Sequence, residues 1–398
     1  MRVLFSCRPA FGHYAPLVPL ADALVGSGHE VCFATAAPLD DAIRRDGFEV
    51  HRAGLSLSEI TATRELDPRF ASARDDLRLF RPLNFAWSFA GFEVPPRLSD
   101  LLRIVEQTKA DLVVHETSEF AGPLAAALTG LPAVNHSYGP LVEAEVMAAA
   151  GISAAEHWTA NGLPPVDRGG MYGRLYLDIT PPSLQFSEIA GVPVVQPIRP
   201  EPFRARTPEP APWLLELGRR PVVAVTLGTV HGRRLDVYRT VIEGLATTDF
   251  DVVVATGSAA VTASLGPLPA NVQVHDWVPW GDLLERSDAV VAHGGAGSTL
   301  AALCQGVPMV VIPLGADHFT NARMLTSSGA ALVLDDDHLS PELVREALAV
   351  AVGERARSAA RRIASEIAAM PSAEAVVPVL EAVTSTAPRR SSGNEGRL

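Results

Sequence analysis

The stretch AVVAHGGAGSTLAALCQGVPMVVIPL, residues 289–314, decides the fold of this chain. Its apolar run at 289–292 is typical of a buried parallel strand, and residues 298–305 can form a helix after a tight turn. The turn consists of His293 and four small residues, and Gly306 ends the helix before a second apolar strand. A strand that turns through glycines into a helix directs backbone N–H groups and the positive end of the helix dipole at one point. The stretch therefore predicts an anion site, and phosphate is the anion that we expect there.

The glycine turn does not match either of two common nucleotide-binding patterns. In the dinucleotide pattern G-x-G-x-x-G, Leu300 stands where the third glycine belongs after Gly295 and Gly297, and no acidic residue ends a strand about 20 positions later. The pattern GxxxxGK[ST] does not occur there either. An NAD site and a nucleoside-triphosphate loop are therefore disfavoured. A diphosphate cradle in which His293 adds a donor remains.

Length and charge limit the classes of protein to consider. With 398 residues the chain exceeds the size at which one core usually stops growing, so we expect two domains. The net charge is -12 and no dense run of Lys and Arg occurs. This charge disfavours nucleic acid and an anionic membrane surface as partners.

Cysteines and terminal sequences give expectations about the compartment. Cys7, Cys32 and Cys304 lie far apart and lack the spacing of a metal site. The N-terminal apolar run is too short for a signal peptide, and no uninterrupted apolar stretch is long enough to span a bilayer. We therefore expect a cytoplasmic protein without a membrane span.

Strands and helices alternate through the first half of the chain. Residues 3–7 form an apolar strand, a loop follows at 8–15, and Pro16 can occupy the first turn of the next helix. The same order recurs downstream, with strands expected at 31–35, 111–115 and 133–136 and a helix near 121–128. The alternation predicts a parallel sheet wrapped by helices, which we assign to residues 1–200. Less regular regions are expected at about 55–97 and 142–176.

Prolines accumulate between residues 196 and 212, where they remove backbone donors and favour extended structure. We place the linker at 201–214 and the second domain at 215–385, including a C-terminal helix near 373–382. The second domain should contain strands at 222–227, 252–256, 273–277, 289–292, 310–313 and 331–334. The tail 386–398 has the composition of a disordered segment. Because the two units share no strand, the sequence predicts two α/β domains whose sheets face each other.

A candidate acid-base pair lies at the ends of two predicted strands. His13 follows the first strand, where open α/β sheets place functional groups, and histidine exchanges protons near neutral pH. It is therefore a candidate general base. Glu116 ends the strand at 111–115 and could hold the imidazole Nδ1–H if the two strands are neighbours. The alternatives are a loop histidine bonded to backbone and a helix-capping Glu116.

Acidic residues follow later strands. Asp317 and His318 come after the strand at 310–313, and Asp317 could accept hydrogen bonds from sugar hydroxyls. An N-cap role for Asp317, at the start of a helix over 319–327, is an equal alternative. Asp335, Asp336 and Asp337 formally match a DxD metal pattern, but a solvated acidic turn explains them better. We therefore expect no metal.

Bulky aromatic residues mark the irregular regions of the first domain. They have two interpretations, a local core or a line of acceptor-binding side chains. The acceptor interpretation assigns to the pocket Phe11, Phe85, Trp87, Phe89 and Tyr138.

The combination of motifs resembles the family-1 glycosyltransferases of the GT-B fold, and within them bacterial enzymes that attach deoxysugars to natural products such as polyketides and macrolides. The resemblance extends over the chain to about Val383. It rests on Gly12-His13-x-x-Pro16, the proline-rich linker, Trp277-Val278-Pro279, HGGAGST at 293–299 and Asp317-His318.

This resemblance implies two Rossmann-like domains that face across a cleft and an inverting hexosyl transfer without a metal or cofactor. A base takes the proton of an acceptor hydroxyl, which attacks the anomeric carbon as the nucleoside diphosphate leaves from the other face. His13 matches the family's base, and Glu116 stands where its partner is often Asp. Asp317 and His318 match positions at the donor sugar. The nucleotide and phosphate positions are matched by Thr229, Trp277, Val278, His293, Gly295, Gly297, Ser298 and Thr299.

Departures from the family pattern bear on the donor. Ala301 stands where plant relatives have a glutamate for the ribose hydroxyls, and His318 where they have a glutamine. Both departures suit a dTDP-deoxysugar better than a UDP-glucose, with a hydrophobic natural product as acceptor. Two alternatives remain at this point, a nucleotide-sugar epimerase and an inactive nucleotide-sugar-binding partner of another transferase. The sequence leaves the oligomeric state open, with a homodimer as one candidate.

Overall fold

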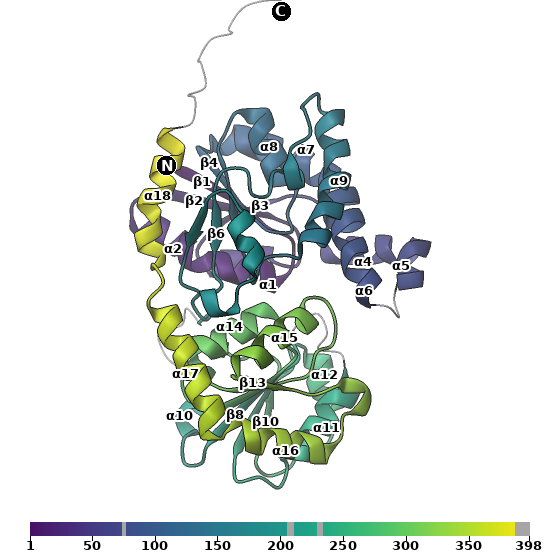
Figure 1. Cartoon of the computed structure of the whole chain (residues 1–398), viewed down its shortest axis with the longest axis vertical. Helices are drawn as coiled ribbons and strands as arrows, with labels where there is room; N and C mark the ends of the chain where they lie inside the picture. The colour runs from purple at the N-terminus through teal and green to yellow at the C-terminus, as the bar shows by residue number, and fades with distance from the viewer. Residues whose placement is uncertain (74–76, 205–210, 229–233, 387–398) are drawn as a thin grey trace, which may run out of the picture.

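Two α/β domains lie one above the other in the computed structural model, which describes residues 1–73, 77–204, 211–228 and 234–386 (Figure 1). Each domain has one sheet, and the strands of both sheets run parallel. The two parallel sheets that we predicted are therefore confirmed. Residues 387–398 of the predicted tail lie outside the described residues.

The first domain contains seven strands in the order β3-β2-β1-β4-β5-β6-β7. Their runs of buried Val, Leu and Phe are what a parallel sheet covered on both faces requires. The predicted strands are present, and β3, β6 and β7 are additional, because runs of three or four partly polar residues carry too weak a pattern to predict. The strands are β1 (Arg2–Ser6), β2 (Glu30–Thr35), β3 (Glu49–Arg52), β4 (Leu112–Glu116), β5 (Ala133–His136), β6 (Tyr176–Asp178) and β7 (Val195–Pro197).

The second domain contains six strands in the order β10-β9-β8-β11-β12-β13. All six were predicted from their apolar runs. In both sheets the strand order reverses beside the first strand of the domain, between β1 and β4 and between β8 and β11. Parallel sheets bind ligands at such reversal points. The strands are β8 (Val222–Thr226), β9 (Asp251–Ala255), β10 (Val272–His275), β11 (Ala289–Ala292), β12 (Met309–Val311) and β13 (Ala331–Val333).

Helices replace most of the irregular structure expected at 55–97. A capping box of Ser56 and Glu59 starts α4, and the non-helical backbone of Gly91 kinks the π-helical η2 near its end. The first-domain helices are α1 (Phe11–Tyr14), α2 (Val18–Gly26), α3 (Asp40–Arg45), α4 (Leu57–Leu66), α5 (Pro68–Ala73), α6 (Leu77–Leu83), η2 (Asn84–Phe92), α7 (Val94–Thr108), α8 (Ala121–Thr129) and α9 (Ala144–Ala160), with short 3-10 turns η1 (Ala15–Leu17), η3 (Asp167–Gly170), η4 (Pro182–Leu184) and η5 (Ser187–Gly191).

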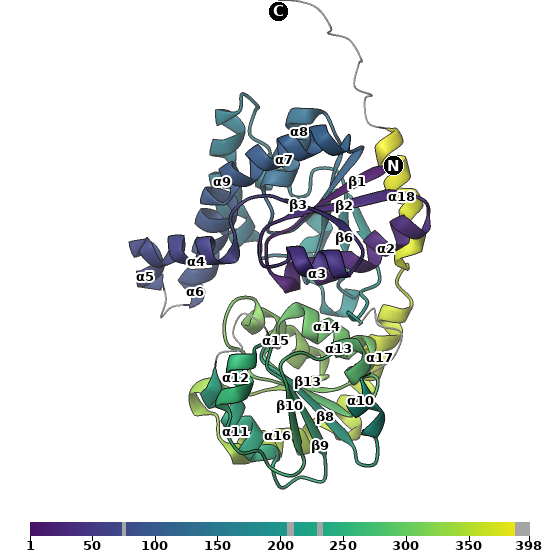
Figure 2. The ribbon, with the colours of Figure 1, turned by 180° about the vertical axis from the view of Figure 1, so that it is seen from behind.

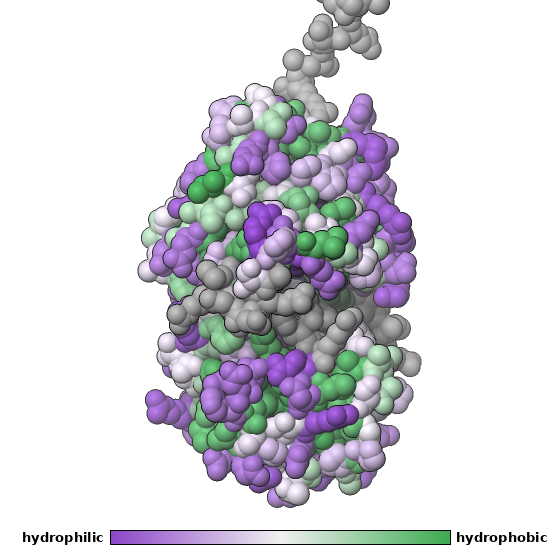
Figure 3. All heavy atoms as spheres, turned by 90° about the vertical axis from the view of Figure 1, so that its right-hand side faces the viewer, coloured by the Kyte–Doolittle hydropathy of each residue, from purple (hydrophilic) through white to green (hydrophobic). Residues whose placement is uncertain are grey.

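The second domain continues with helices on both faces of its sheet (Figure 1). They are α10 (Pro212–Glu216), α11 (Leu235–Leu245), α12 (Ala259–Ser264), α13 (Trp280–Leu284), α14 (Ala296–Cys304), α15 (His318–Ser328), η6 (Asp336–His338), α16 (Pro341–Ala351), α17 (Glu354–Ala368) and α18 (Ala373–Ser385). No single helix of the described residues is long and apolar enough to cross a membrane, although the bent pair α17 and α18 together meets that length and composition. Hydrophilic and hydrophobic residues are interspersed over the coloured part of one side of the molecule (Figure 3).

The C-terminal helix corrects the predicted domain assignment. We placed it in the second domain, but α18 crosses back and packs against α2 of the first domain (Figure 2). Val376 and Leu380 belong to the same core cluster as Leu20 and Leu24. The periodicity of a helix sequence indicates an apolar face, but it does not indicate which domain covers that face.

Leu380 offers a test of this docking. Its side chain is fully buried, so Leu380→Ala should lower the free energy of unfolding by about 2–5 kcal/mol. Chemical denaturation of the full chain measures the loss. Val350, which lies exposed on α16, is the control, since Val350→Ala should change stability little. Equal losses in the two variants would contradict the docking of α18.

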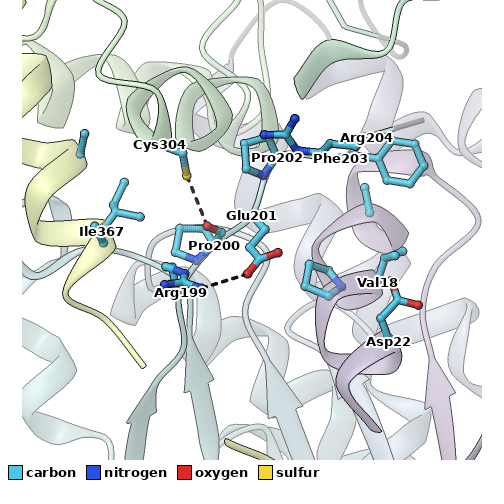
Figure 4. Close-up of a pocket in the computed structure, with 14 residues that line it drawn as sticks. Val18, Asp22, Arg199, Pro200, Glu201, Pro202, Phe203, Arg204, Cys304 and Ile367 are labelled. Carbon is cyan, nitrogen blue, oxygen red and sulfur yellow. Dashed lines mark hydrogen bonds and ion pairs between the residues drawn. The ribbon is translucent and has the colours of Figure 1, made fainter. Parts of the chain in front are cut away.

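Residues 199–204, where the linker begins, line a cavity of about 550 Å³ (Figure 4). Pro197 lies in the edge strand β7, where proline is tolerated, so part of the proline-rich region belongs to the first sheet. Arg199 and Glu201 form an ion pair of 3.4 Å in the cavity wall, and the Cys304 thiol donates to the carbonyl of Pro200. None of the predicted site residues lines this cavity.

Candidate active site

The predicted acid-base pair is assembled at the centre of the first sheet. Strand β1 pairs with β4, so the turn after β1 lies beside the end of β4. His13, in α1, places its Nδ1 3.1 Å from Oε1 of Glu116. The His13 side chain is 18% exposed, whereas that of Glu116 is fully buried. The predicted proximity is therefore confirmed, and the imidazole retains an accessible edge.

Several donors converge on the Glu116 carboxylate. The Ser118 backbone N–H donates to Oε2 at 2.6 Å, its hydroxyl donates to both oxygens, and the Arg8 backbone N–H donates to Oε1 at 3.3 Å. Burial alone would raise the pKa of Glu116, but the charge and hydrogen bond of His13 and the Ser118 N–H lower it to about 2. Glu116 is therefore ionised at neutral pH, which favours the His13 tautomer that carries its proton on Nδ1.

Sequence reasoning missed Ser118. Its hydroxyl lies 3.2 Å from Nδ1 of His13 and also contacts Glu116, so it touches both members of the pair. A serine two residues after a carboxylate is too common to stand out in a sequence. Its role follows from the fold, because the turn after β4 brings Ser118 back against Glu116.

Tyr138 packs against the imidazole. The two ring centroids are 4.8 Å apart, and burial, with a smaller contribution from the charges of Glu116 and Asp317, raises the pKa of Tyr138. The phenol therefore stays neutral. Since Glu116 and Asp317 come from different domains, Tyr138 lies where the two domains meet.

The glycine turn in the second domain forms as predicted, between β11 and α14. A Cβ atom on Gly228 or Gly295 would lie 2.6 or 2.4 Å from Nε2 of His293, so only glycine leaves room for the imidazole. Gly294 has a φ of +86°, which again favours glycine. Gly297 is exposed and Ser298 half-buried at the start of α14. The geometry of the predicted anion cradle is therefore present, since the first backbone N–H groups of a helix have no partner within the helix.

Thr299 lies near the start of α14. It is 4% exposed and lines a small cavity between the domains, together with Pro140 and Thr180. Its contact with the diphosphate stays a prediction.

Asp317 and His318 differ in their surroundings. Asp317 occupies the N-cap position of α15, but its side chain makes no capping bond and instead accepts from Asn321 Nδ2 at 2.7 Å. His318 is 4% exposed, stands edge-on against His293 at 4.5 Å, and accepts from the Leu314 N–H. The sugar contact of His318 stays a prediction.

The predicted base-binding segment follows β10. Trp277 is 56% exposed, which leaves its indole open for stacking, whereas the side chain of Val278 is buried in the core of the second domain. Thr229, a predicted phosphate contact, lies outside the described residues.

Four of the predicted acceptor aromatics pack against other aromatic rings. Phe85 and Phe89 lie in the first-domain core and contact each other at 4.8 Å. Trp87 packs with neighbouring aromatic rings, and Phe11 packs at 5.0 Å against Phe203 of the linker. The local-core interpretation holds for Phe85 and Phe89, whereas Phe11 and Trp87 are half-buried and their role at the acceptor stays a prediction. Of the five, Tyr138 reaches the candidate base.

The loop after β5 connects the two half-sites. Tyr138 contacts His13, and the next residue, Gly139, approaches α14 so closely that a Cβ there would lie 2.6 Å from that of Ala296. Apolar side chains cross the domain interface in both directions. Leu300 of the second domain packs in the first-domain core, and Leu184 of the first domain packs in the second-domain core. Base and cradle therefore lie on either side of one short loop.

A polar contact joins the domains nearby. Thr320 on α15 donates to Glu143 of the first domain at 2.7 Å, and Arg81 bonds to both. These bonds tie the helix that starts at Asp317 to helices α6 and α9.

The acidic run after β13 forms a short turn. Asp335 accepts from the N–H of Asp337 and contacts His338, while Asp336 pairs with Arg234 at 2.9 Å. Among the residues that the structure describes, no three His, Cys, Asp or Glu side chains are grouped to hold a metal ion. The acidic run thus fits a surface turn.

Known proteins share this architecture over almost the full chain. The L-demethylnoviosyl transferase of Streptomyces niveus is 34% identical over 96% of this chain and 98% of its own length. The glycosyltransferase SsfS6 from Streptomyces sp. SF2575, complexed with thymidine diphosphate, has a TM-score of 0.78 and 26% identity, covering 96% of this chain and 99% of that one. The spinosyn rhamnosyltransferase SpnG with spinosyn aglycone has a TM-score of 0.79 and 26% identity, covering 96% and 100%.

Two family models match in succession. Residues 22–228 match the N-terminal domain of the erythromycin biosynthesis protein CIII-like family, and residues 239–383 match its C-terminal domain. An epimerase or an inactive partner is not favoured by these matches. The chain therefore belongs to the erythromycin biosynthesis protein CIII-like family, and it is a glycosyltransferase of the GT-B fold.

Proposed function

We propose that this enzyme transfers a deoxysugar from a dTDP-sugar to a hydroxyl group of a hydrophobic natural-product acceptor, with inversion at the anomeric carbon. The observation that carries the proposal is the placement of the His13–Glu116 pair and the glycine cradle on either side of the loop 138–140. A base beside one face of the sugar and an anion site beside the other are what an in-line displacement requires.

Each half of the site has a chemical role in this mechanism. His13 takes the acceptor proton on Nε2, and Glu116 stabilises the imidazolium that forms. The hydroxyl oxygen bonds to the anomeric carbon while the bond from that carbon to the diphosphate breaks. The N–H groups of Gly297 and Ser298 and the dipole of α14 stabilise the charge of the leaving diphosphate. This stabilisation uses fixed dipoles and no metal.

Other residues complete donor recognition. Trp277 stacks on the nucleobase, His293 adds a donor beside the diphosphate, and Asp317 accepts from sugar hydroxyls. Ala301 offers no acceptor for a ribose 2′-hydroxyl, which favours a deoxyribose. A relative of the same fold is complexed with thymidine diphosphate, which supports the same choice.

The donor nucleotide is the first measurement to make. Calorimetric titration should show tighter binding of dTDP than of UDP, and a mass-spectrometric screen should show transfer from dTDP-deoxysugars to polyketide or macrolide aglycones. UDP held more tightly than dTDP would overturn the assignment of the donor. Release of an epimerised free nucleotide sugar in the absence of acceptor would instead favour an epimerase.

A further inference from the structure

Asn321 connects two parts of the donor site. It lies in the second turn of α15 and is 3% exposed. Its amide nitrogen donates to the carbonyl oxygen of Gly294 at 2.8 Å and to Oδ2 of Asp317 at 2.7 Å. The first bond reaches the glycine turn, and the second reaches the carboxylate at the start of α15.

These two acceptors fix the orientation of the amide. A carbonyl and a carboxylate oxygen can only accept, so both hydrogens of the NH₂ group are used and the amide oxygen must face elsewhere. Within the described part of the chain, Oδ1 of Asn321 has no hydrogen-bond partner, and the residue lines the small interdomain cavity with Thr299 and Thr180. Asn321 therefore spans from the glycine turn to the domain interface.

Asn271 makes a similar set of hydrogen bonds with a purely structural role, and it serves as a comparison. Asn271 also donates its amide twice, to the carbonyls of Leu245 and Phe250 at 3.0 and 3.1 Å, and its Oδ1 is also buried without a partner among the described residues. Both of its acceptors are backbone atoms away from the cleft. Asn321 differs because one of its acceptors is a side-chain carboxylate.

We propose that Asn321 is a positioning residue that sets the distance between the diphosphate cradle and Asp317, and so determines which sugars this enzyme accepts. The inference rests on the proposed function, which places the diphosphate at the glycine turn and a sugar hydroxyl at Asp317. A carboxylate held by one short bond from a buried amide has little freedom to follow a sugar of different shape. Asn321 acts through Asp317 and Gly294 and does not itself touch the substrate.

Asn321→Asp is the sharpest change because it preserves shape. It replaces both N–H donors with oxygen, which then faces the Gly294 carbonyl and the negative charge of Asp317. Loss of a bond to a charged group together with a new repulsion should weaken the contribution of the sugar to binding by about 10–100-fold. Asn271→Asp makes the same chemical change at an asparagine that bonds only backbone carbonyls, and it is the matched control.

Calorimetry with dTDP and dTDP-L-rhamnose separates the sugar contribution from the nucleotide contribution. In Asn321→Asp the affinity for dTDP-L-rhamnose should fall at least tenfold more than the affinity for dTDP, whereas in Asn271→Asp the two affinities should change together. The effects of Asn321→Asp and Asp317→Ala should not add in the double variant, because without the Asp317 carboxylate Asn321 has no group to position. Steady-state kinetics of transfer should show the same difference in KM for the sugar donor.

The outcomes distinguish this inference from the function on which it rests. A wild-type enzyme that does not bind dTDP would reject the proposed function itself. A wild type that binds dTDP but loses no more sugar affinity in Asn321→Asp than in Asn271→Asp would reject the positioning role alone.

Discussion

Replacement of His13 by alanine is expected to lower kcat for sugar transfer by about 10²–10⁴-fold while leaving the affinity for dTDP nearly unchanged. The large effect follows from the geometry of the first half-site. Glu116 and Ser118 occupy the Nδ1 side of the imidazole at 3.1 and 3.2 Å, which leaves Nε2 for the acceptor hydroxyl. The small effect on dTDP follows because the cradle belongs to the other domain.

Single-turnover kinetics and calorimetry measure these two quantities separately. His51→Ala is a suitable control, since His51 on β3 also pairs with a carboxylate, that of Glu49 at 3.1 Å, but belongs to an edge strand of the sheet. It should transfer sugar at the wild-type rate. Full transfer activity in His13→Ala would remove His13 as the base, and an equal loss in both variants would point to a general effect on folding.

The parts of this site that the sequence could predict lie at the carboxyl ends of apolar strands. The strand of residues 289–292 is continuously apolar, and the glycines after it leave few alternatives to a strand-turn-helix. His13 follows β1 and Glu116 ends β4, and they meet because these strands are neighbours, which was the condition of the prediction.

The parts that could not be predicted depend on which way a side chain points. Phe85 and Phe89 have the residue types of a binding pocket, but they face the core, and His318 faces His293. Ser118 and Asn321 are ordinary polar residues, and each joins a near neighbour, Glu116 or Asp317, to a residue farther away in the chain, His13 or Gly294. The apolar pattern of a helix likewise does not indicate the domain against which the helix packs, as α18 shows.

Glu116→Gln is expected to lower kcat by about 10²–10⁴-fold through loss of charge rather than loss of shape. The wild-type carboxylate receives the Ser118 N–H, the Ser118 hydroxyl and the Nδ1 side of His13. A glutamine amide has one oxygen and one NH₂ group, so the NH₂ faces either the Ser118 N–H or the Arg8 N–H, and both of these can only donate. The imidazolium that forms during transfer also loses its counter-charge, and the Nδ1–H tautomer is no longer favoured.

Stability against pH provides an independent readout of the same carboxylate. The folded structure lowers the pKa of Glu116 from 4.5 to about 2, so ionised Glu116 stabilises the fold fully above pH 4.5, and this contribution is lost as pH falls toward 2. The stability difference between wild type and Glu116→Gln should therefore be constant above pH 4.5 and should shrink below it.

Glu119→Gln is the control. Glu119 is a second buried carboxylate, and it accepts hydrogen bonds from the N–H groups of Ala121 and Gly122. Because burial raises the pKa of Glu119, its removal should not reproduce this pH dependence, and it should spare kcat. Equal losses of kcat in the two variants would show that the site needs buried carboxylates for folding and not Glu116 for proton transfer.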